Sequence, residues 1–215
     1  MTHPYWPLWD LRLRVGEVDL RPMTEADLVP LADLLPDDVE LDPDATRYPG
    51  LPEATNRRVI GFQRYWNGYG SWRPEQWQLG FCVRAGGELV GVQELAADDF
   101  PLLRTVDSAS HLVPAVRGRG IGRQMRRAIL ALAFGPLRAQ AAITSAWHDN
   151  YASLAVSRAL GYQPNGESLH RRGDQVDTLQ HLRLPRSDWL AGDGAAGVRI
   201  EGMDGCWPYF GIEPR

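Results

Sequence analysis

Lysine is absent from this chain of 215 residues, and all 23 of its basic residues are arginine. No lysine can therefore form a Schiff base, hold a nucleotide phosphate as in a Walker loop, or become acylated itself. Cysteine is scarce: Cys82 and Cys206 lie far apart and fit no metal-ligand spacing. Because Cys82 falls within an apolar run, we expect it to be a reduced thiol in the core.

Long apolar runs and an excess of positive charge are also missing. No stretch of about 18 apolar residues occurs, so we expect no membrane span. The first ten residues, MTHPYWPLWD, lack the basic start and apolar stretch of a signal peptide. The formal net charge of −4 gives no reason to expect a nucleic-acid partner. These absences predict a cytoplasmic protein.

The length and the hydrophobic content of 44% suit one globular domain with an extension. A small-residue segment, LAGDGAAG, begins at position 190 and has the composition of a linker. We therefore expect a domain over 1–190 and a C-terminal extension over 191–215. The extension contains VRIEGMDGCWPYFGI, which has β character.

Apolar spacing predicts an α/β chain with the order ββ-α-α-β-β-β-α-β-α-β. The central strand, loop, helix and strand form a predicted βαβ unit. Its helix carries an apolar face composed of Ile121, Met125, Ala128, Ile129, Leu132 and Ala133. The other expected elements are a hairpin or bent strand at 8–23, helices at 24–35 and 52–67, a loop at 36–52, a hairpin at 77–95 that turns at Gly86–Gly87, a strand ending near Val113, a strand at 139–148, a helix capped by Asn150 and stopped by Gly161, and a strand within 178–189.

The segment RGRGIGRQMRR, from Arg117 to Arg127, combines closely spaced glycines with the start of the long helix. A dinucleotide fingerprint fails because its third glycine position is Arg123, and a Walker loop fails for want of lysine. The pattern Arg-x-x-Gly-x-Gly does fit. Glycines allow successive backbone N–H groups to converge on an anion, and the helix dipole adds to the attraction. A pyrophosphate suits this loop best; the alternative is a simple turn under a solvated basic helix.

A second segment, NYASLAVSRALGY, begins at Asn150 directly after a strand. Together with HLVPAVRGRGIGRQM it resembles motifs B and A of the GCN5-related N-acetyltransferase (GNAT) family. The resemblance covers roughly Val18 to Leu184. The pattern N..S..V...LGY looks similar to the ribosomal-protein-alanine acetyltransferase branch. WPLWDLRL, VDSAS and the C-terminal tail resemble an actinobacterial subgroup that includes users of succinyl-CoA.

This resemblance implies a mixed, mostly antiparallel sheet flanked by helices, in which two central parallel strands splay apart. The splayed strands would be Ser108–Val113 and Ala142–Trp147, with coenzyme A in the gap. Backbone groups at Leu112 and Val113 would bind the pantetheine arm, which Asn150 and Ser153 would also contact. The pyrophosphate would be held by Arg117, Gly118, Arg119, Gly120, Ile121, Gly122 and Arg123.

The same resemblance suggests the catalytic residues. Ser157 stands where many relatives have a tyrosine that protonates the leaving thiolate, and a backbone N–H near Val113 would stabilise the thioester oxygen. Asp107 and Glu94 are candidates for the base, acting through water, and His111 has the parity to share a face with Asp107. The plainer alternatives are that Asp107 and Glu94 are solvated acids and that His111 only packs against its neighbours. Ser157 could likewise be a helix residue without a catalytic role. We expect His148 to be structural.

Aromatic residues follow the second helix and could line the acceptor pocket, although aromatic stripes more often pack in cores. They are Tyr65, Trp66, Tyr69 and Trp72. Arg57, Arg64 and Arg104 would suit a carboxylated acyl donor or an acidic acceptor, but arginine is the only long cation that this chain uses.

The predicted function is that of an acyl-CoA-dependent N-acyltransferase without a metal. It would move an acetyl or succinyl group from CoA to a primary amine, on a small molecule or a protein, by direct attack in a ternary complex. The alternative is a non-catalytic CoA-binding or interaction protein with the same fold. A homodimer is also expected from the resemblance. The failed glycine fingerprint excludes a dinucleotide oxidoreductase.

Overall fold

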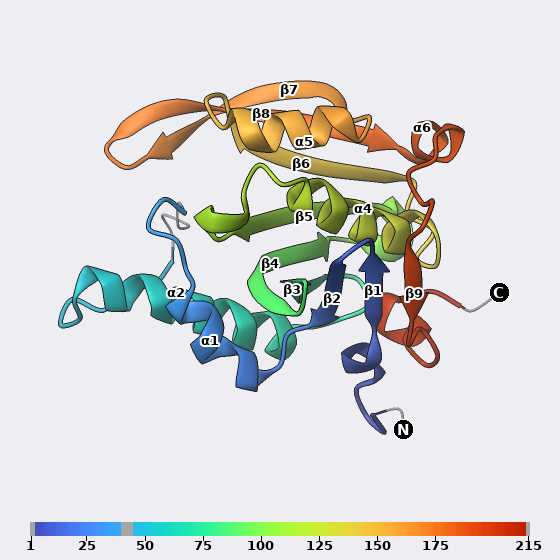
Figure 1. The fold of residues 1–215 in the computed structure, drawn as a ribbon, viewed down its shortest axis with the longest axis horizontal. Helices are drawn as coiled ribbons and strands as arrows, with labels where there is room; N and C mark the ends of the chain where they lie inside the picture. Colours follow the sequence, from blue (N-terminus) through green and yellow to red (C-terminus); the bar gives the residue numbers. More distant parts are fainter. Residues whose placement is uncertain (1–2, 40–44, 214–215) are drawn as a thin grey trace.

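The computed structural model describes residues 3–39 and 45–213, so part of the expected loop at 36–52 lies outside the described residues. Nine strands form one sheet in the order β7-β8-β6-β5-β4-β3-β2-β1-β9 (Figure 1). The strands are β1 (Arg12–Val15), β2 (Val18–Pro22), β3 (Trp77–Ala85), β4 (Glu88–Ala97), β5 (Thr105–Leu112), β6 (Ala141–Trp147), β7 (Gln163–Arg172), β8 (Gln175–Pro185) and β9 (Arg199–Glu201). The helices are α1 (Leu28–Asp33), α2 (Glu53–Gly70), α3 (Phe100–Leu103), α4 (Ile121–Phe134), α5 (Tyr151–Ala159) and α6 (Arg186–Ala191).

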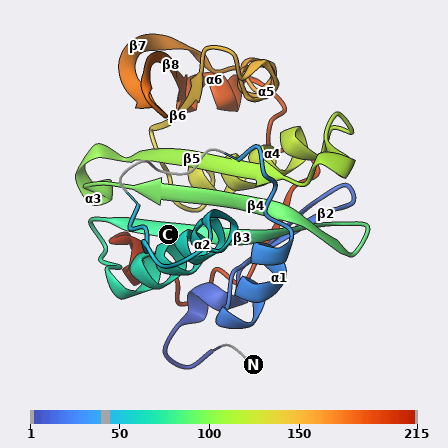
Figure 2. The same cartoon turned by 90° about the vertical axis from the view of Figure 1, so that its left-hand side faces the viewer.

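The two faces of the sheet are covered by different helices. The helices α1 and α2 lie over one face, in front of β3 and β4, and α4 lies on the other (Figure 2). The apolar face predicted for α4 is confirmed, because its side chains are buried in the main core. Leu79, Phe81 and Leu95 project into that core from the sheet. The sequence-predicted α/β class and the mostly antiparallel sheet are thus both found.

One strand is missing from the order predicted by sequence. The strand β7 pairs with β8 as a hairpin at the edge of the sheet. Its sequence, QPNGESLHRR, has eight exposed and two half-buried residues, so no apolar alternation marks it. The apolar pattern is the main signal for a strand, and an edge hairpin that is held by backbone bonds lacks it.

The strands β5 and β6 form the parallel pair predicted for the centre of the sheet, and they separate early. Their pairing begins at Thr105–Ala141 and ends at Asp107–Ile143. Just beyond it, the Thr144 hydroxyl donates to the Ser108 carbonyl at 2.9 Å. The strands then continue to Leu112 and Trp147 without further pairing to each other. The predicted splay is therefore present, narrow at Ser108–Thr144 and open toward the two strand ends.

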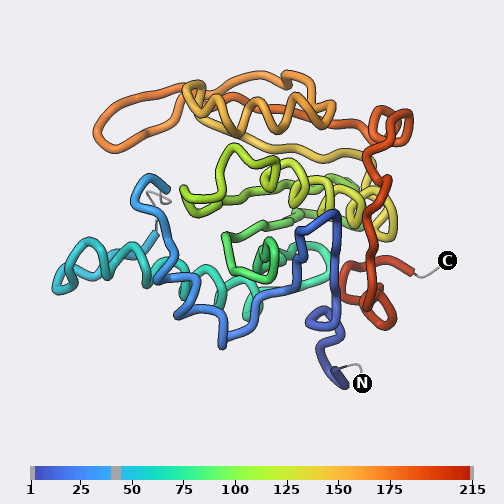
Figure 3. Tube along the Cα trace, viewed as in Figure 1, coloured from blue at the N-terminus to red at the C-terminus, as the bar shows by residue number. Residues whose placement is uncertain are grey.

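The last part of the chain returns to the edge of the sheet that lies opposite the β7 edge. Figure 3 shows it running beside β1, and β9 pairs with β1 in antiparallel register. Cys206, Phe210 and Ile212 are buried there in the main core. The β character expected for this segment is confirmed. Because these side chains complete the core under β1, removing the segment would expose apolar surface.

Both cysteines are buried free thiols, and burial raises the pKa of each to about 12. The expectation of a reduced core thiol at Cys82 is confirmed. In the described part of the chain, no helix combines the length and apolar character needed to cross a bilayer.

Candidate active site

The glycine loop ends in a helix start that no side chain caps. Gly118 and Gly120 have positive φ angles of +75° and +82°, and Gly120 is the N-cap of α4. The first intrahelical bond runs from the Gln124 N–H to the Gly120 carbonyl. The N–H groups of the first turn lie before it and have no partner within the helix. These N–H groups are therefore free to bind an anion, which stays a prediction for this turn.

The three loop arginines differ in what they contact. The Arg117 Nε donates to the Leu112 carbonyl at 2.9 Å, and its Nη2 donates to Asp38 at 2.9 Å. These bonds direct the Arg117 side chain across to the segment after α1, so it fixes the loop in place. Arg119 and Arg123 are exposed beside the uncapped turn. They are better placed than Arg117 to contact a bound anion.

The backbone of β5 offers N–H groups to the gap at alternate residues. Val113 donates its N–H to the Val90 carbonyl of β4 at 2.9 Å, so this group is not available to a thioester. By the alternation of a strand, the N–H groups of Ser110 and Leu112 point the other way, into the gap. The donor expected near Val113 is therefore not the Val113 N–H, and the N–H groups of Leu112 and Ser110 stay candidates.

The helix α5 borders the open end of the same gap. The Asn150 side chain accepts a hydrogen bond from the Ser153 N–H at 3.1 Å, which confirms its capping role. Ser157 is buried, and its hydroxyl donates to the Ser153 carbonyl at 3.1 Å. A Cβ on Gly122 would lie 3.8 Å from both Leu112 and Val156. The start of α4 thus lies close to the middle of α5 and to the end of β5.

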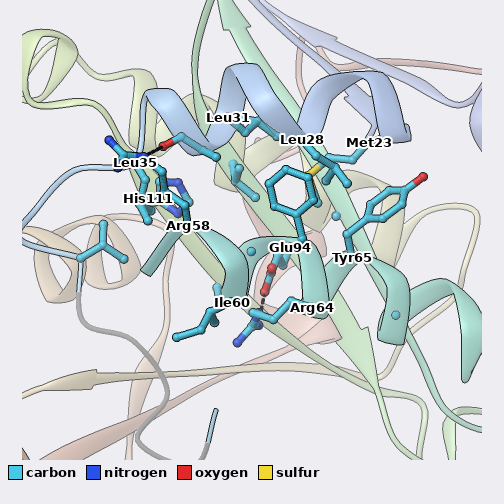
Figure 4. Close-up of a pocket in the computed structure, with 18 of the residues that line it drawn as sticks. Met23, Leu28, Leu31, Leu35, Arg58, Ile60, Arg64, Tyr65, Glu94 and His111 are labelled. Atoms are coloured by element: carbon cyan, nitrogen blue, oxygen red, sulfur yellow. Dashed lines mark hydrogen bonds and ion pairs between the residues drawn. The ribbon is translucent and has the colours of Figure 1, made fainter. Parts of the chain in front are cut away.

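A cavity of about 250 Å³ lies between the α1–α2 pair and strands β3 to β5 (Figure 4). Its floor includes Glu94, Ala109 and His111, and its roof is mainly apolar. The Arg64 guanidinium donates to Glu94 at 2.7 Å, the contact dashed in Figure 4. Glu94 is 16% exposed, and among the described residues that line the cavity it is a partly buried carboxylate paired with a cation.

His111 faces this cavity as a neutral group. Burial lowers its pKa to about 4, and the positive charges of Arg117 and Arg64 act in the same direction. An imidazole with that pKa is uncharged at neutral pH and is a weak base. It can still accept a hydrogen bond from a ligand in the cavity.

Asp107 lies on the same face of β5 as His111, as the strand parity predicts. It is opposite Ala96 in β4 and opposite Ile143 at the last paired position of β6. Its side chain is exposed, but the surrounding strands partly desolvate the carboxylate and raise its pKa, and the bond from the Ser108 N–H at 2.6 Å acts against that rise. Asp107 is not among the residues that line the cavity. It sits instead at the narrow end of the splay.

The aromatic residues of α2 separate into two environments. Tyr65 and Tyr69 line the cavity, and the Tyr69 hydroxyl donates to the Met23 carbonyl at 2.8 Å. Trp72 stacks on Trp77 in the core, and Trp66 is 53% exposed. Of the four aromatic residues considered from sequence, Tyr65 and Tyr69 line the cavity, and Phe62 of the same helix lines it too.

The arginines considered for a carboxylate also separate. Arg57 lines the cavity but donates to the carbonyls of Pro36, Asp37 and Val39. Arg64 is paired with Glu94. Arg104 lies at the other end of β5 in a separate surface hollow with Arg138 and Arg186. None of the three is a free cation at the splay.

Sequence reasoning overlooked Arg126, which lies on α4 and is only 3% exposed. In the sequence it appears as one of several arginines on a helix, a pattern typical of a solvated face. It also overlooked a hydrogen-bonded chain on the missed hairpin. His181 contacts Ser145 at 2.9 Å and Ser168 at 2.7 Å, and Ser168 contacts His170 at 2.9 Å. His148 is paired with Asp177 at 2.9 Å, as expected of a structural residue.

An uncapped helix start beside two diverging parallel strands suits an extended ligand with a diphosphate, and the adjoining cavity suits a second substrate. These features define a group-transfer protein of mixed α/β class. The model of the acetyltransferase (GNAT) domain matches residues 17–163, and the chain belongs to this family.

Solved structures share the fold at low sequence identity. RimJ of Mycobacterium smegmatis in complex with CoA-disulfide is 21% identical, with 90% of this chain and 94% of that chain covered and a TM-score of 0.65. A probable acetyltransferase is 18% identical, with 83% of this chain and 98% of that chain covered and a TM-score of 0.64. A chimera of spermidine N-acetyltransferase SpeG from Vibrio cholerae and hSSAT is 15% identical, with 82% of this chain and 100% of that chain covered and a TM-score of 0.62.

Proposed function

We propose that this protein is an acyl-CoA-dependent N-acyltransferase, which moves an acetyl or succinyl group from CoA to a primary amine. The observation that carries the proposal is the early separation of β5 and β6 directly beside the uncapped start of α4. The amine attacks the thioester directly while both substrates are bound. Membership of the family supports this reaction class.

Residues of the splay and the loop fit the acyl-CoA donor. The N–H groups of the first turn of α4 would hold the diphosphate, with Arg119 and Arg123 adding charge. The gap-facing N–H groups of Ser110 and Leu112 would bind the pantetheine arm as a strand would. The donor supplies a thioester whose carbonyl carbon accepts the amine.

The transfer needs two proton movements. A primary alkylammonium has a pKa of about 10, so it must lose one proton to a base before it can attack. The amine nitrogen then bonds to the carbonyl carbon, the carbon–sulfur bond breaks, and the thiolate takes up a proton. The N–H of Ser110 or Leu112 is positioned to stabilise the carbonyl oxygen as its negative charge grows.

Among the candidate bases, Asp107 is best suited to receive the first proton. Its carboxylate is at the narrow end of the splay, and its raised pKa brings it nearer to neutral pH. Glu94 is engaged by Arg64, and His111 has a pKa of only about 4. We assign these two residues to the acceptor cavity, where a carboxylate and a neutral imidazole can orient an amine.

The proton for the thiolate has a less direct source. Ser157 would have to turn its hydroxyl away from the Ser153 carbonyl to reach sulfur. A water molecule bound at the open end of the gap is a second route. Replacing Ser157 with alanine distinguishes the two, because only the first route loses its donor.

We also propose a cytoplasmic homodimer with one acyltransferase domain over 1–190 and an extension over 191–215. Exposed apolar residues on the β7–β8 hairpin, Leu169 and Val176, support a protein contact there. Light scattering during gel filtration tests the dimer, and Leu169→Asp should reduce it to a monomer if the hairpin forms the interface.

The test of the proposed function is release of the CoA thiol from acetyl-CoA and succinyl-CoA with a panel of amines. The panel should contain a polyamine, a peptide with a free N-terminal alanine and a small primary amine. Amine-dependent thiol release and an acylated product support the proposal. Binding of CoA without transfer to any amine would favour the alternative, a non-catalytic CoA-binding protein.

A further inference from the structure

Arg126 is a buried cation that forms no ion pair with a carboxylate among residues 3–39 and 45–213. Its side chain leaves α4 and is only 3% exposed. The two terminal nitrogens make long contacts of 3.4 Å to neutral hydroxyls, Nη1 to Thr144 and Nη2 to Ser110. Nε is buried and has no hydrogen-bond partner.

Such an arrangement is unfavourable unless the buried guanidinium gains an anionic hydrogen-bond acceptor. A guanidinium stays charged at all ordinary pH values and offers five donors. Burying a charge is costly unless it is paired and hydrogen-bonded. The charge of Asp107 interacts with Arg126 at longer range, but its carboxylate accepts its hydrogen bond from the Ser108 N–H. The hydroxyls of Ser108 and Tyr162 are also buried beside Arg126, and Tyr162 lies within reach of both Ser108 and Arg126. The cluster therefore surrounds a buried cation with neutral hydroxyls and lacks a carboxylate in direct contact with it.

The position of this cluster identifies the ligand group that could supply the acceptor. Ser110 lies on one arm of the splay and Thr144 on the other, one residue past the last strand pair. The diphosphate site is at the open end, at the start of α4. A donor that extends from that site into the gap brings its acyl group to the narrow end. Ser110, which contacts Arg126 Nη2, is exposed, so the buried guanidinium lies directly behind a residue that borders the gap.

We propose that Arg126 binds a terminal carboxylate on the acyl group, so that the preferred donor is the CoA thioester of a short dicarboxylic acid. This inference rests on the proposed acyl-CoA function and names its substrate class. A succinyl group places a carboxylate two methylene groups beyond the thioester carbonyl. The guanidinium then gains charge-assisted hydrogen bonds, to which the Tyr162 and Ser108 hydroxyls can add.

Uncharged acyl groups lack this interaction. Acetyl carries no carboxylate, and butyryl matches succinyl in chain length but ends in a methyl group. Either would leave the Arg126 charge unpaired. The difference between succinyl-CoA and butyryl-CoA therefore isolates the carboxylate from the length of the chain.

The experiment measures binding of CoA, acetyl-CoA, butyryl-CoA and succinyl-CoA to the full-length protein by calorimetry, followed by turnover with an amine that the panel identifies. We expect succinyl-CoA to bind about 10- to 100-fold more tightly than butyryl-CoA, the range that charge-assisted hydrogen bonds give. Arg126→Met should abolish this preference and leave binding of CoA unchanged. Arg127→Met, on the next residue of the same helix, should keep the preference.

A second variant serves if Arg126→Met does not fold. Ser110→Asp changes an exposed residue and places a carboxylate against Arg126 Nη2. It should lower the succinyl preference by at least 10-fold relative to wild type, because it supplies the missing charge from within the protein.

The outcomes separate this proposal from the proposed function. Binding of CoA and acetyl-CoA with no preference for succinyl-CoA over butyryl-CoA overturns the carboxylate site and leaves N-acyl transfer intact. Equal loss of turnover with both donors in Arg126→Met would assign Arg126 to the thioester oxygen, and it also overturns the proposal. Failure to bind any of the four CoA compounds overturns both.

Discussion

Gly120→Asp tests whether the start of α4 holds the diphosphate, and Gly87→Asp is its control. The two glycines have similar positive φ angles, +82° for Gly120 and +88° for Gly87. A Cβ built on either has no atom within 4 Å. Both variants therefore add the same side chain at matched backbone strain in open space, but Gly87 lies in the β3–β4 turn, away from the splay.

The expected loss of affinity follows from electrostatics. An aspartate at 120 would place its charge roughly 5 Å from a diphosphate held by the first turn, which at an effective dielectric of about 20 costs about 3 kcal/mol per charge pair. Solvent at this exposed loop weakens the repulsion, and the second charge of the diphosphate restores part of it. We expect a net loss of about 3 kcal/mol, or roughly 100-fold in the Kd for CoA.

Calorimetric titration with CoA and thermal unfolding form the assay. Both variants should lose stability to a similar extent, roughly 1 to 2 kcal/mol from left-handed strain. Only Gly120→Asp should lose CoA affinity, and Gly87→Asp should bind as the wild type does. Unchanged affinity in Gly120→Asp, with the fold intact, would refute the assigned diphosphate site.

Three further predictions concern titrating groups. Asp107→Asn should lower kcat by about 100-fold or more at pH 7 with little change in CoA affinity, and an unchanged rate would exclude Asp107 as the base. His111→Asn should leave the shape of the kcat profile between pH 6 and 8 unaltered, because the pKa of His111 is about 4; loss of an inflection in that range would contradict this. Burial raises the pKa of Asp27, but bonds from Arg21 and Thr24 outweigh it and lower the pKa to about 2. The stability that the Asp27 carboxylate contributes is therefore full above pH 4 and lost as the pH falls to 2. Asp27→Asn should lower the unfolding free energy at pH 7 by on the order of 2 kcal/mol and flatten its dependence on pH below 4, as measured by urea unfolding.

The parts of the fold that bury apolar side chains were predictable from sequence. The face of α4 and the hairpin of β3 and β4 follow from their spacing. The strand β7 was not, because an edge strand held by backbone bonds needs no apolar alternation. The pairing of β9 with β1 was not either, since sequence spacing does not say which strands become neighbours.

The candidate site divides in the same way. The glycine loop and the Asn150 cap are local features, and local geometry can be inferred from local sequence. Which groups are already engaged depends on contacts between distant segments. Arg117 donates a hydrogen bond to Asp38, and the Val113 N–H donates one to the Val90 carbonyl. Arg126 was the site residue hardest to predict, because the sequence does not indicate which of the 23 arginines is buried.

The most direct test of the central claim is a crystal structure of the protein with bound CoA. The diphosphate should accept hydrogen bonds from the N–H groups of the first turn of α4, and the thiol should lie between β5 and β6 near Ser110. A nucleotide bound elsewhere, or a thiol that lies outside the gap, would contradict the account.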